Sequence, residues 1–290
     1  MIPVSPVAVM AEVRVLPLIV FSLLVGIGIL LARRDADESG AGGVAAIARA
    51  FDAGATIFQK VTILVMELTP FGVFALMAWV AGTLGVDALA ALGQVVFLNY
   101  LGCFLIIGII YAGMIKFIAR LPVIDFFRGI IDAMAVSYST ASSNATLPVT
   151  LRCARRNLGV SNSVASFVIS LGATINMNGT AMYLGLATLF GAQIFGVDLS
   201  WGDYFLISIL GTLGAIGAAG IPGAGLIMMA LVFGAVGVPL ETIAFVAGVD
   251  RIMDMMRTTT NVSGDAAVAT TVASLTNEID RAEMISADDV

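Results

Sequence analysis

Apolar residues run along most of this chain in stretches long enough to cross the hydrocarbon core of a bilayer. Each stretch is closed by a short polar or charged segment, and a water-soluble domain has no core able to bury so many long apolar helices. The pattern therefore predicts an all-α integral membrane protein. The stretches cover residues 15–31, 53–81, 95–118, 164–195, 204–236 and 243–273.

Two segments interrupt the pattern of full spans. Residues 123–138 and 147–155 are each too short to cross a bilayer, and the polar segment 139–146 lies between them. A second break at 211–225, which ends in the glycine-rich run 217–225, divides the stretch 204–236. Pro222 cannot continue a helix, and the neighbouring glycines permit an irregular turn. Irregular backbone at membrane depth is tolerated where protein buries it or where it lines a cavity. We therefore expect two re-entrant helical hairpins whose tips lie inside the protein, the first entering from the cytoplasmic side.

Each hairpin is followed by a long span that carries polar residues, at 176–180 after the first and at 250–265 after the second. A hairpin followed by a helix thus occurs twice, once from each side of the membrane. Inverted repeats with broken helices that meet near the midplane are typical of secondary transporters.

The last long span carries a polar stripe made of Asp250, Asp254, Arg257, Asn261 and Asp265. At 100° per residue this spacing confines the five side chains to an arc of about 80° on one helix face. Charges at membrane depth cost on the order of 2.5–3.5 kcal/mol each and are retained mainly for pairing or for a substrate path. The stripe predicts one wall of a polar binding site.

Composition narrows the function further. The chain is 59% hydrophobic and 12% charged, about half the charge of a typical soluble domain. It contains no histidine, and Cys103 and Cys153 have no metal or disulfide spacing, so neither an enzyme nor a bound cofactor is expected. No segment indicates nucleic-acid binding. Lys and Arg gather on one side if the loop 32–49 is cytoplasmic, which predicts a multi-pass protein of the plasma (inner) membrane with a cytoplasmic C-terminus.

Four motifs occur in one order along the chain: SSNATLP at 142–148, GATINMNGT at 172–180, GIPGAG at 220–225 and DMMRTTTNVSGD at 254–265. With them the chain resembles the dicarboxylate/amino acid:cation symporter family, the glutamate transporters. The resemblance implies a glutamate-transporter-like inverted repeat with two re-entrant helical hairpins. It also implies partial scaffold helices at 1–82 (the end of the family's fourth helix and its fifth), a transport domain at 83–277 without the family's third helix, and an acidic cytoplasmic tail at 278–290.

The resemblance also implies the site. Arg257 pairs with the side-chain carboxylate of the substrate, Asp254 receives its ammonium group, and Asn261 with Ser142 and Ser143 holds its α-carboxylate. The other substrate-binding residues so implied are Met177, Thr180, Ile221, Gly225 and Thr258. Sodium, the implied coupling ion, is held by positions matching Gly172, Thr174, Asn176, Ala215, Ile216, Ala218, Asn261 and Asp265.

The expected function is secondary active symport of aspartate or glutamate driven by sodium entry, in a homotrimer if the missing N-terminal helices are supplied. Two alternatives stay open: a C4-dicarboxylate symporter, and a truncated or split fragment without independent transport. Asp254 argues against an amine-free dianion, which it would repel.

The chain departs from the family pattern in three respects. It begins near the end of the fourth helix, it lacks a second arginine at Ala141 or Met255, and Asn178 stands where the family has an acid. That acid and the third helix contribute to one sodium site, so we expect this site to be altered here.

Overall fold

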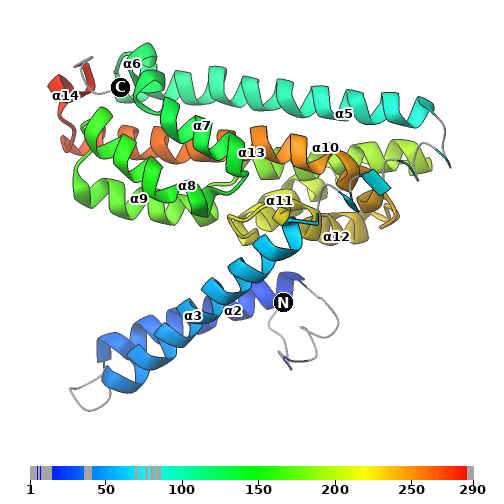
Figure 1. The fold of residues 1–290 in the computed structure, drawn as a ribbon, viewed down its shortest axis with the longest axis horizontal. Coiled ribbons are helices and arrows are strands. Elements are labelled where there is room, and N and C mark those ends of the chain that lie inside the picture. Colours follow the sequence, from blue (N-terminus) through cyan, green and yellow to red (C-terminus); the bar gives the residue numbers. More distant parts are fainter. Residues whose placement is uncertain are drawn as a thin grey trace. The chain divides into compact units, whose positions relative to one another are not determined.

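The computed structural model describes residues 5, 7, 15–35, 41–68, 71–72, 74–75, 78, 82 and 86–285. The chain divides into two compact units, Met1–Gly72 and Val73–Val290. In the first unit, α2 (Val15–Asp35) and α3 (Ala41–Met66) pack against each other (Figure 1). The helix α2 agrees with the predicted span 15–31. The helix α3 begins earlier than the predicted span 53–81, and much of the later part of that span lies outside the described residues.

The second unit opens with a long helical run. It consists of α5 (Val86–Leu105) and two π-helical segments, η1 (Ile106–Tyr111) and η2 (Met114–Ala119). By length and composition, Ala90–Ala119 qualifies to cross a membrane, with 30 residues and a mean hydropathy of 2.3. The predicted span 95–118 is therefore helical. The run ends at Arg120, which takes a left-handed backbone conformation with φ 56°.

The first hairpin has arms close to those predicted. Its elements are α6 (Val123–Gly129), α7 (Ile131–Thr140), α8 (Ser143–Arg152) and the π-helical segment η3 (Cys153–Asn157). The tip is shorter than the predicted 139–146, because α7 continues to Thr140 and α8 already begins at Ser143. Ser142 explains the early start of α8, since its hydroxyl accepts a hydrogen bond from the Ala145 amide at 3.2 Å and caps the helix.

The predicted span 164–195 is not one continuous helix, because two helices occupy it: α9 (Asn162–Ile175) and α10 (Asn178–Phe195). Asn176 and Met177 between them have non-helical dihedral angles. The second predicted break is present, but it is shorter than the predicted 211–225 because α11 stays helical to Gly217. The helices α11 (Trp201–Gly217) and α12 (Ala224–Val236) flank an irregular turn at 218–223.

The 35-residue helix α13 (Thr242–Thr276) lies at the centre of the second unit, and α5, α7, α9, α10 and α12 pack against it (Figure 1). It is followed by α14 (Arg281–Ile285). The segment before α14 is docked on the protein: Ile279 forms an isolated β-bridge with Val160, and Met284 is buried in the core. The described residues form no other strand pairing.

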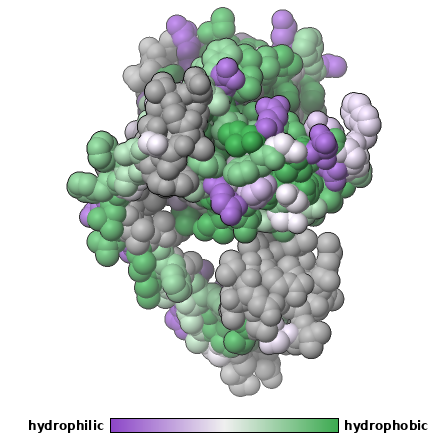
Figure 2. Space-filling view, turned by 90° about the vertical axis from the view of Figure 1, so that its right-hand side faces the viewer, coloured by the Kyte–Doolittle hydropathy of each residue, from purple (hydrophilic) through white to green (hydrophobic). Residues whose placement is uncertain are grey.

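Hydrophobic side chains lie over much of the surface turned to the viewer in Figure 2. Large apolar side chains are exposed on α5, on the π-helical segments, on α9 and on α11, among them Phe97, Phe117, Phe167 and Phe205. Contiguous exposed apolar surface of this kind is found where a protein meets a membrane or a partner.

Candidate functional site

The tips of the two hairpins touch each other. The Gly220 carbonyl in the second tip accepts a hydrogen bond from the Ser142 hydroxyl in the first tip at 2.7 Å. It accepts another from the backbone amide of Asn144, in the first turn of α8, at 3.0 Å. A Cβ atom on residue 220 would lie 2.7 Å from the Asn144 side-chain oxygen and 3.1 Å from the Ala173 carbonyl. A side chain at position 220 would therefore crowd the contact between the two tips.

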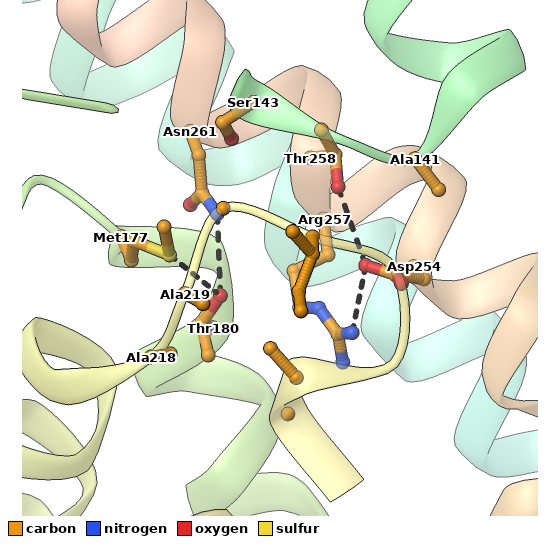
Figure 3. Close-up of a pocket in the computed structure, with 14 residues that line it drawn as sticks. Ala141, Ser143, Met177, Thr180, Ala218, Ala219, Asp254, Arg257, Thr258 and Asn261 are labelled. Atoms are coloured by element: carbon orange, nitrogen blue, oxygen red, sulfur yellow. Dashed lines mark hydrogen bonds and ion pairs between the residues drawn. The ribbon is translucent and has the colours of Figure 1, made fainter. Parts of the chain in front are cut away.

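A small pocket lies between the two tips, α10 and α13 (Figure 3). Its free space of about 10 Å³ holds roughly one water molecule. Nine of the ten predicted substrate-binding residues line it, and Ser142 is the exception because its hydroxyl turns to Gly220. The lining residues are Ala141, Ser143, Met177, Thr180, Ala218, Ala219, Gly220, Ile221, Ala224, Gly225, Asp254, Arg257, Thr258 and Asn261.

Arg257 is the largest buried side chain of the described part, with 2% of its surface exposed. Its guanidinium lies 2.7 Å from the Asp254 carboxylate, 3.4 Å from that of Asp250, and 4.0 Å above the centre of the Tyr183 ring. Tyr183 in turn donates a hydrogen bond to Asp250. Two carboxylates thus share one buried cation, and pairing is what allows these charges to be buried.

No role was predicted for Asp250 beyond its place in the polar stripe, and Tyr183 was not predicted at the site. Asp250 belongs to the polar stripe, and its separation of seven residues from Arg257 places both on one helix face. That spacing was a usable signal. Tyr183 lies on α10, far from the stripe in sequence, and no sequence pattern marks it as a partner of Arg257.

The polar side chains opposite Arg257 tie α10 to α13. Asn261 donates to the Thr180 hydroxyl at 3.2 Å and accepts from the Gly179 amide at 2.8 Å, and the Thr180 hydroxyl faces the Met177 sulfur at 3.9 Å (Figure 3). A Cβ on residue 179 would lie 2.7 Å from the Arg257 carbonyl. The start of α10 is thereby held against the middle of α13.

A second polar group surrounds Asp265, one helical turn beyond Asn261. The Asp265 carboxylate is buried, accepts a hydrogen bond from the Asn176 amide at 2.9 Å, and lies directly against Gly172. Asn178 donates to the Asn176 side-chain oxygen and to the Tyr111 hydroxyl, each at 3.0 Å. Across the described residues, no lysine or arginine forms an ion pair with Asp265. A buried carboxylate without a cationic partner fits a cation site.

The other predicted sodium ligands do not all lie beside Asp265. Asn261 and Ala218 line the pocket, and Ala215 and Ile216 lie near the end of α11, which packs against α9. Thr174 lies on α9, where its hydroxyl donates to the Leu171 carbonyl at 2.8 Å. Among the predicted ligands, Gly172 and Asn176 are the ones with an observed contact to Asp265.

Comparison with known proteins decides the family, because residues 1–275 match the family described as sodium:dicarboxylate symporter family. The chain belongs to the sodium:dicarboxylate symporter family. The family resemblance predicted from the four motifs is thereby confirmed. Members of the family are transporters, so the chain is not an enzyme, as predicted, and membrane localisation follows.

Three similar proteins show the extent of the match. The proton/glutamate-aspartate symporter of Escherichia coli (strain K12) is 33% identical over 99% of this chain and 63% of its own length. The excitatory amino acid transporter of Caenorhabditis elegans is 40% identical over 72% of this chain and 42% of its own length. Human excitatory amino acid transporter 2 is also 40% identical, over 72% of this chain and 37% of its own length. The chain spans less than two thirds of the length of each of these relatives.

Proposed function

We propose that this chain forms the substrate-binding part of a secondary active symporter that couples cation entry to uptake of aspartate or glutamate. The observation that carries the proposal is the buried Arg257 between two hairpin tips, held by two carboxylates in a pocket lined by polar groups. The names of the relatives support an acidic amino acid as substrate.

In this proposal the substrate replaces contacts that the pocket makes within itself. The side-chain carboxylate of the substrate takes the planar fork of Arg257, which suits bidentate contact. Asp254, released from Arg257, receives the substrate ammonium. Asn261 and the first tip at Ser143 and Ser142 hold the α-carboxylate. Each charge of the substrate thus meets the opposite charge or a hydrogen-bond donor.

Cation coupling belongs to the same proposal. Sodium prefers hard oxygen ligands, and it would be held by Asp265 with Gly172, Asn176 and Asn261, and by carbonyls of Thr174, Ala215, Ile216 and Ala218. When bound there, a sodium ion would neutralise the negative charge of the Asp265 carboxylate. A proton on Asp265 would serve the same purpose, and the Escherichia coli relative is named as a proton symporter. Asp265 has no lysine or arginine partner among the described residues, which is compatible with either ion. We propose sodium because the family description names it.

The second hairpin acts as the lid of the pocket. The pocket has room for about one water molecule, so an amino acid enters when the tip at 218–223 moves away from the first tip. We propose further that both hairpins are re-entrant, that 83–277 is the transport domain beside scaffold helices at 1–82, and that 278–290 is an acidic cytoplasmic tail. The protein would be a homotrimer in the plasma (inner) membrane, with its C-terminus in the cytoplasm.

A binding experiment tests this function. We expect the purified chain to bind labelled aspartate in a sodium-dependent manner and to bind succinate much more weakly, because Asp254 faces the position of the missing ammonium. Equilibrium dialysis with each ligand, with and without sodium, measures both affinities. Preference for succinate would favour the C4-dicarboxylate alternative, and binding that depends on pH instead of sodium would favour proton coupling.

A further inference from the structure

Arg251 reaches from α13 to the tip of the first hairpin. Its guanidinium donates to the Ser139 carbonyl at 3.3 Å and to the Thr140 carbonyl at 3.4 Å, across more than 110 residues of sequence. The side chain is half-buried, and across the described residues no carboxylate lies within ion-pair distance of it. Its charge is therefore directed at backbone oxygens.

These two oxygens are the last carbonyls of α7. The final four carbonyls of a helix have no partner within the helix, and they form the negative end of its dipole. In α7, the Ser137 carbonyl accepts a hydrogen bond from the Ala141 amide at 2.9 Å. Arg251 donates hydrogen bonds to the carbonyls of Ser139 and Thr140. A cation at this position stabilises the end of α7 and fixes where the helix stops.

The contact lies directly beside the pocket. Ala141, the residue after Thr140, takes a left-handed conformation with φ 51° and lines the pocket together with Ser143. The left-handed conformation is costly for a residue with a side chain, so surrounding contacts must maintain it. The Thr140 hydroxyl helps by accepting from the Ser142 amide at 3.3 Å, and Arg251 holds the carbonyls on the other side of the turn.

One turn of α13 thus holds both tips. Arg251 binds the first tip, and three residues later Asp254 accepts a hydrogen bond from the Gly223 amide of the second tip at 2.8 Å. The second tip is bound through a carboxylate that is also paired with Arg257. The first tip is bound through Arg251, which within the described part of the chain forms no ion pair with Asp250, Asp254 or any other carboxylate.

We propose that Arg251 is a positioning residue that clamps the first tip to α13 and so keeps Ala141 and Ser143 in place for the α-carboxylate of the substrate. This inference rests on the proposed function for the identity of the ligand, but the clamp itself is a property of the protein without ligand. The planar fork of arginine reaches both carbonyls, whereas the single ammonium of lysine retains the charge with fewer fixed contacts.

Thiol labelling tests the clamp without any substrate. Both native cysteines are buried, so an Ala141→Cys chain carries one informative thiol. We expect Arg251→Gln in that background to raise the rate of labelling by a methanethiosulfonate reagent about fivefold, and Arg251→Lys to raise it less. Arg152→Gln is the matched control, because Arg152 forms an exposed ion pair with Asp132 on the same hairpin. Equal labelling rates in the Gln variant and its parent would overturn the clamp.

Aspartate binding tests the role of the clamp in the site. In the otherwise unaltered chain, Arg251→Gln should weaken aspartate binding about tenfold, Arg251→Lys should recover part of that loss, and Arg152→Gln should leave affinity unchanged. The melting temperature of the Gln variant should match that of the control. Full affinity in the Gln variant, or a melting temperature lowered enough to explain the loss, would overturn the inference. If the unaltered chain binds no aspartate, the proposed function fails, and the labelling result still decides the clamp.

Discussion

Asp254 contacts both the buried Arg257 and the second tip. One of its carboxylate oxygens lies 2.7 Å from the Arg257 guanidinium, and the other accepts a hydrogen bond from the Gly223 amide at 2.8 Å. The same oxygen that faces Arg257 also accepts from the Thr258 hydroxyl at 3.2 Å. Any ligand that draws Asp254 away from Arg257 therefore also acts on the backbone of the second tip. In the proposed function, substrate binding and the position of the second tip are therefore coupled through Asp254.

Replacing Arg257 with threonine should abolish selectivity for acidic substrates. The variant lacks the cation proposed to meet the substrate's side-chain carboxylate, and a buried unpaired charge costs roughly 2–5 kcal/mol, or about 30- to 4,000-fold in affinity. Competition of labelled ligand by aspartate and by serine measures the change. We expect serine to be tolerated, and unchanged aspartate affinity would refute the assignment of Arg257.

Replacing Asp254 with asparagine should alter both substrate choice and the lid. The amide is neutral, so an amine-free diacid such as succinate is repelled less and should gain affinity relative to aspartate by about tenfold or more. The acceptor for the Gly223 amide is also weaker, so a thiol introduced by Ile221→Cys should be labelled faster than in the Asp254 parent. An unchanged ratio of the two affinities would show that Asp254 does not face the ammonium group.

A methyl group on Gly220 should prevent the two tips from meeting. Its Cβ would lie 2.7 Å from the Asn144 side-chain oxygen, which would have to move, and 3.1 Å from the Ala173 carbonyl, which is a tight contact. Gly220→Ala should therefore weaken aspartate binding at least tenfold and accelerate labelling at the second tip. Gly234→Ala is the control, because a Cβ there meets nothing within 4 Å and alanine favours the helix. Normal binding by the Gly220 variant would mean that closure does not depend on this contact.

Asp265→Asn should weaken the sodium dependence of substrate binding. The variant loses the buried negative charge of the proposed cation site, whereas Asn178 is already neutral and donates to Asn176 and Tyr111. The slope of log affinity against log sodium concentration reports the number of linked ions, and it should fall by about one in Asp265→Asn. Asn178→Ala serves as the comparison and should change the slope much less. A slope unaffected by Asp265→Asn, with binding that follows pH, would establish proton coupling instead.

Glu278 should make stability depend on acid pH. Its pKa lies below the ordinary value because the hydroxyls of Ser161 and Ser163 each donate to its carboxylate, at 2.7 Å. A carboxyl group with a lowered folded pKa contributes stability above its unfolded value, about 4.3, and loses that contribution as the pH falls through the folded value. In Glu278→Gln, the melting temperature should therefore fall less as the pH drops from about 5 to about 3. The difference should be small because the group is exposed. Glu241→Gln, at the other end of α13, is the control. An equal acid-induced loss in both variants would contradict this role.

Local sequence signals, such as proline and glycine runs, predicted the helix break at the second tip. Pro222 and its glycines marked the second tip, and the spacing from Asp250 to Asp265 marked the buried face of α13. The break at Asn176 and Met177 was missed because it lies inside a long, largely apolar stretch and neither proline nor a glycine run marks it. The extent of the first tip was overestimated because polar residues such as Asn144 and Thr146 are compatible with a helix once Ser142 caps it.

Contacts between residues far apart in the sequence could not be predicted from local sequence patterns. Tyr183 reaches Asp250 from another helix, and Ile279 pairs with Val160 more than 100 residues away. The motif resemblance compensated for this in the pocket, where it named nine lining residues. It gave no indication of Tyr183, nor of Arg251 at the first tip, because neither lies within a quoted motif.

The unbroken course of α13 makes the register of this helix a determinant of function in its own right. Arg251, Asp254, Arg257, Asn261 and Asp265 are all carried by one helix, in which each residue advances the chain by about 1.5 Å and turns it by about 100°. Inserting a single alanine between Asn261 and Asp265 would keep Arg251, Asp254 and Arg257 in phase with one another. It would turn Asp265 by about 100° away from the helix face that it shares with Asn261. A substitution along α13 changes one side chain, whereas a single insertion or deletion turns every residue after it by about 100° relative to those before it.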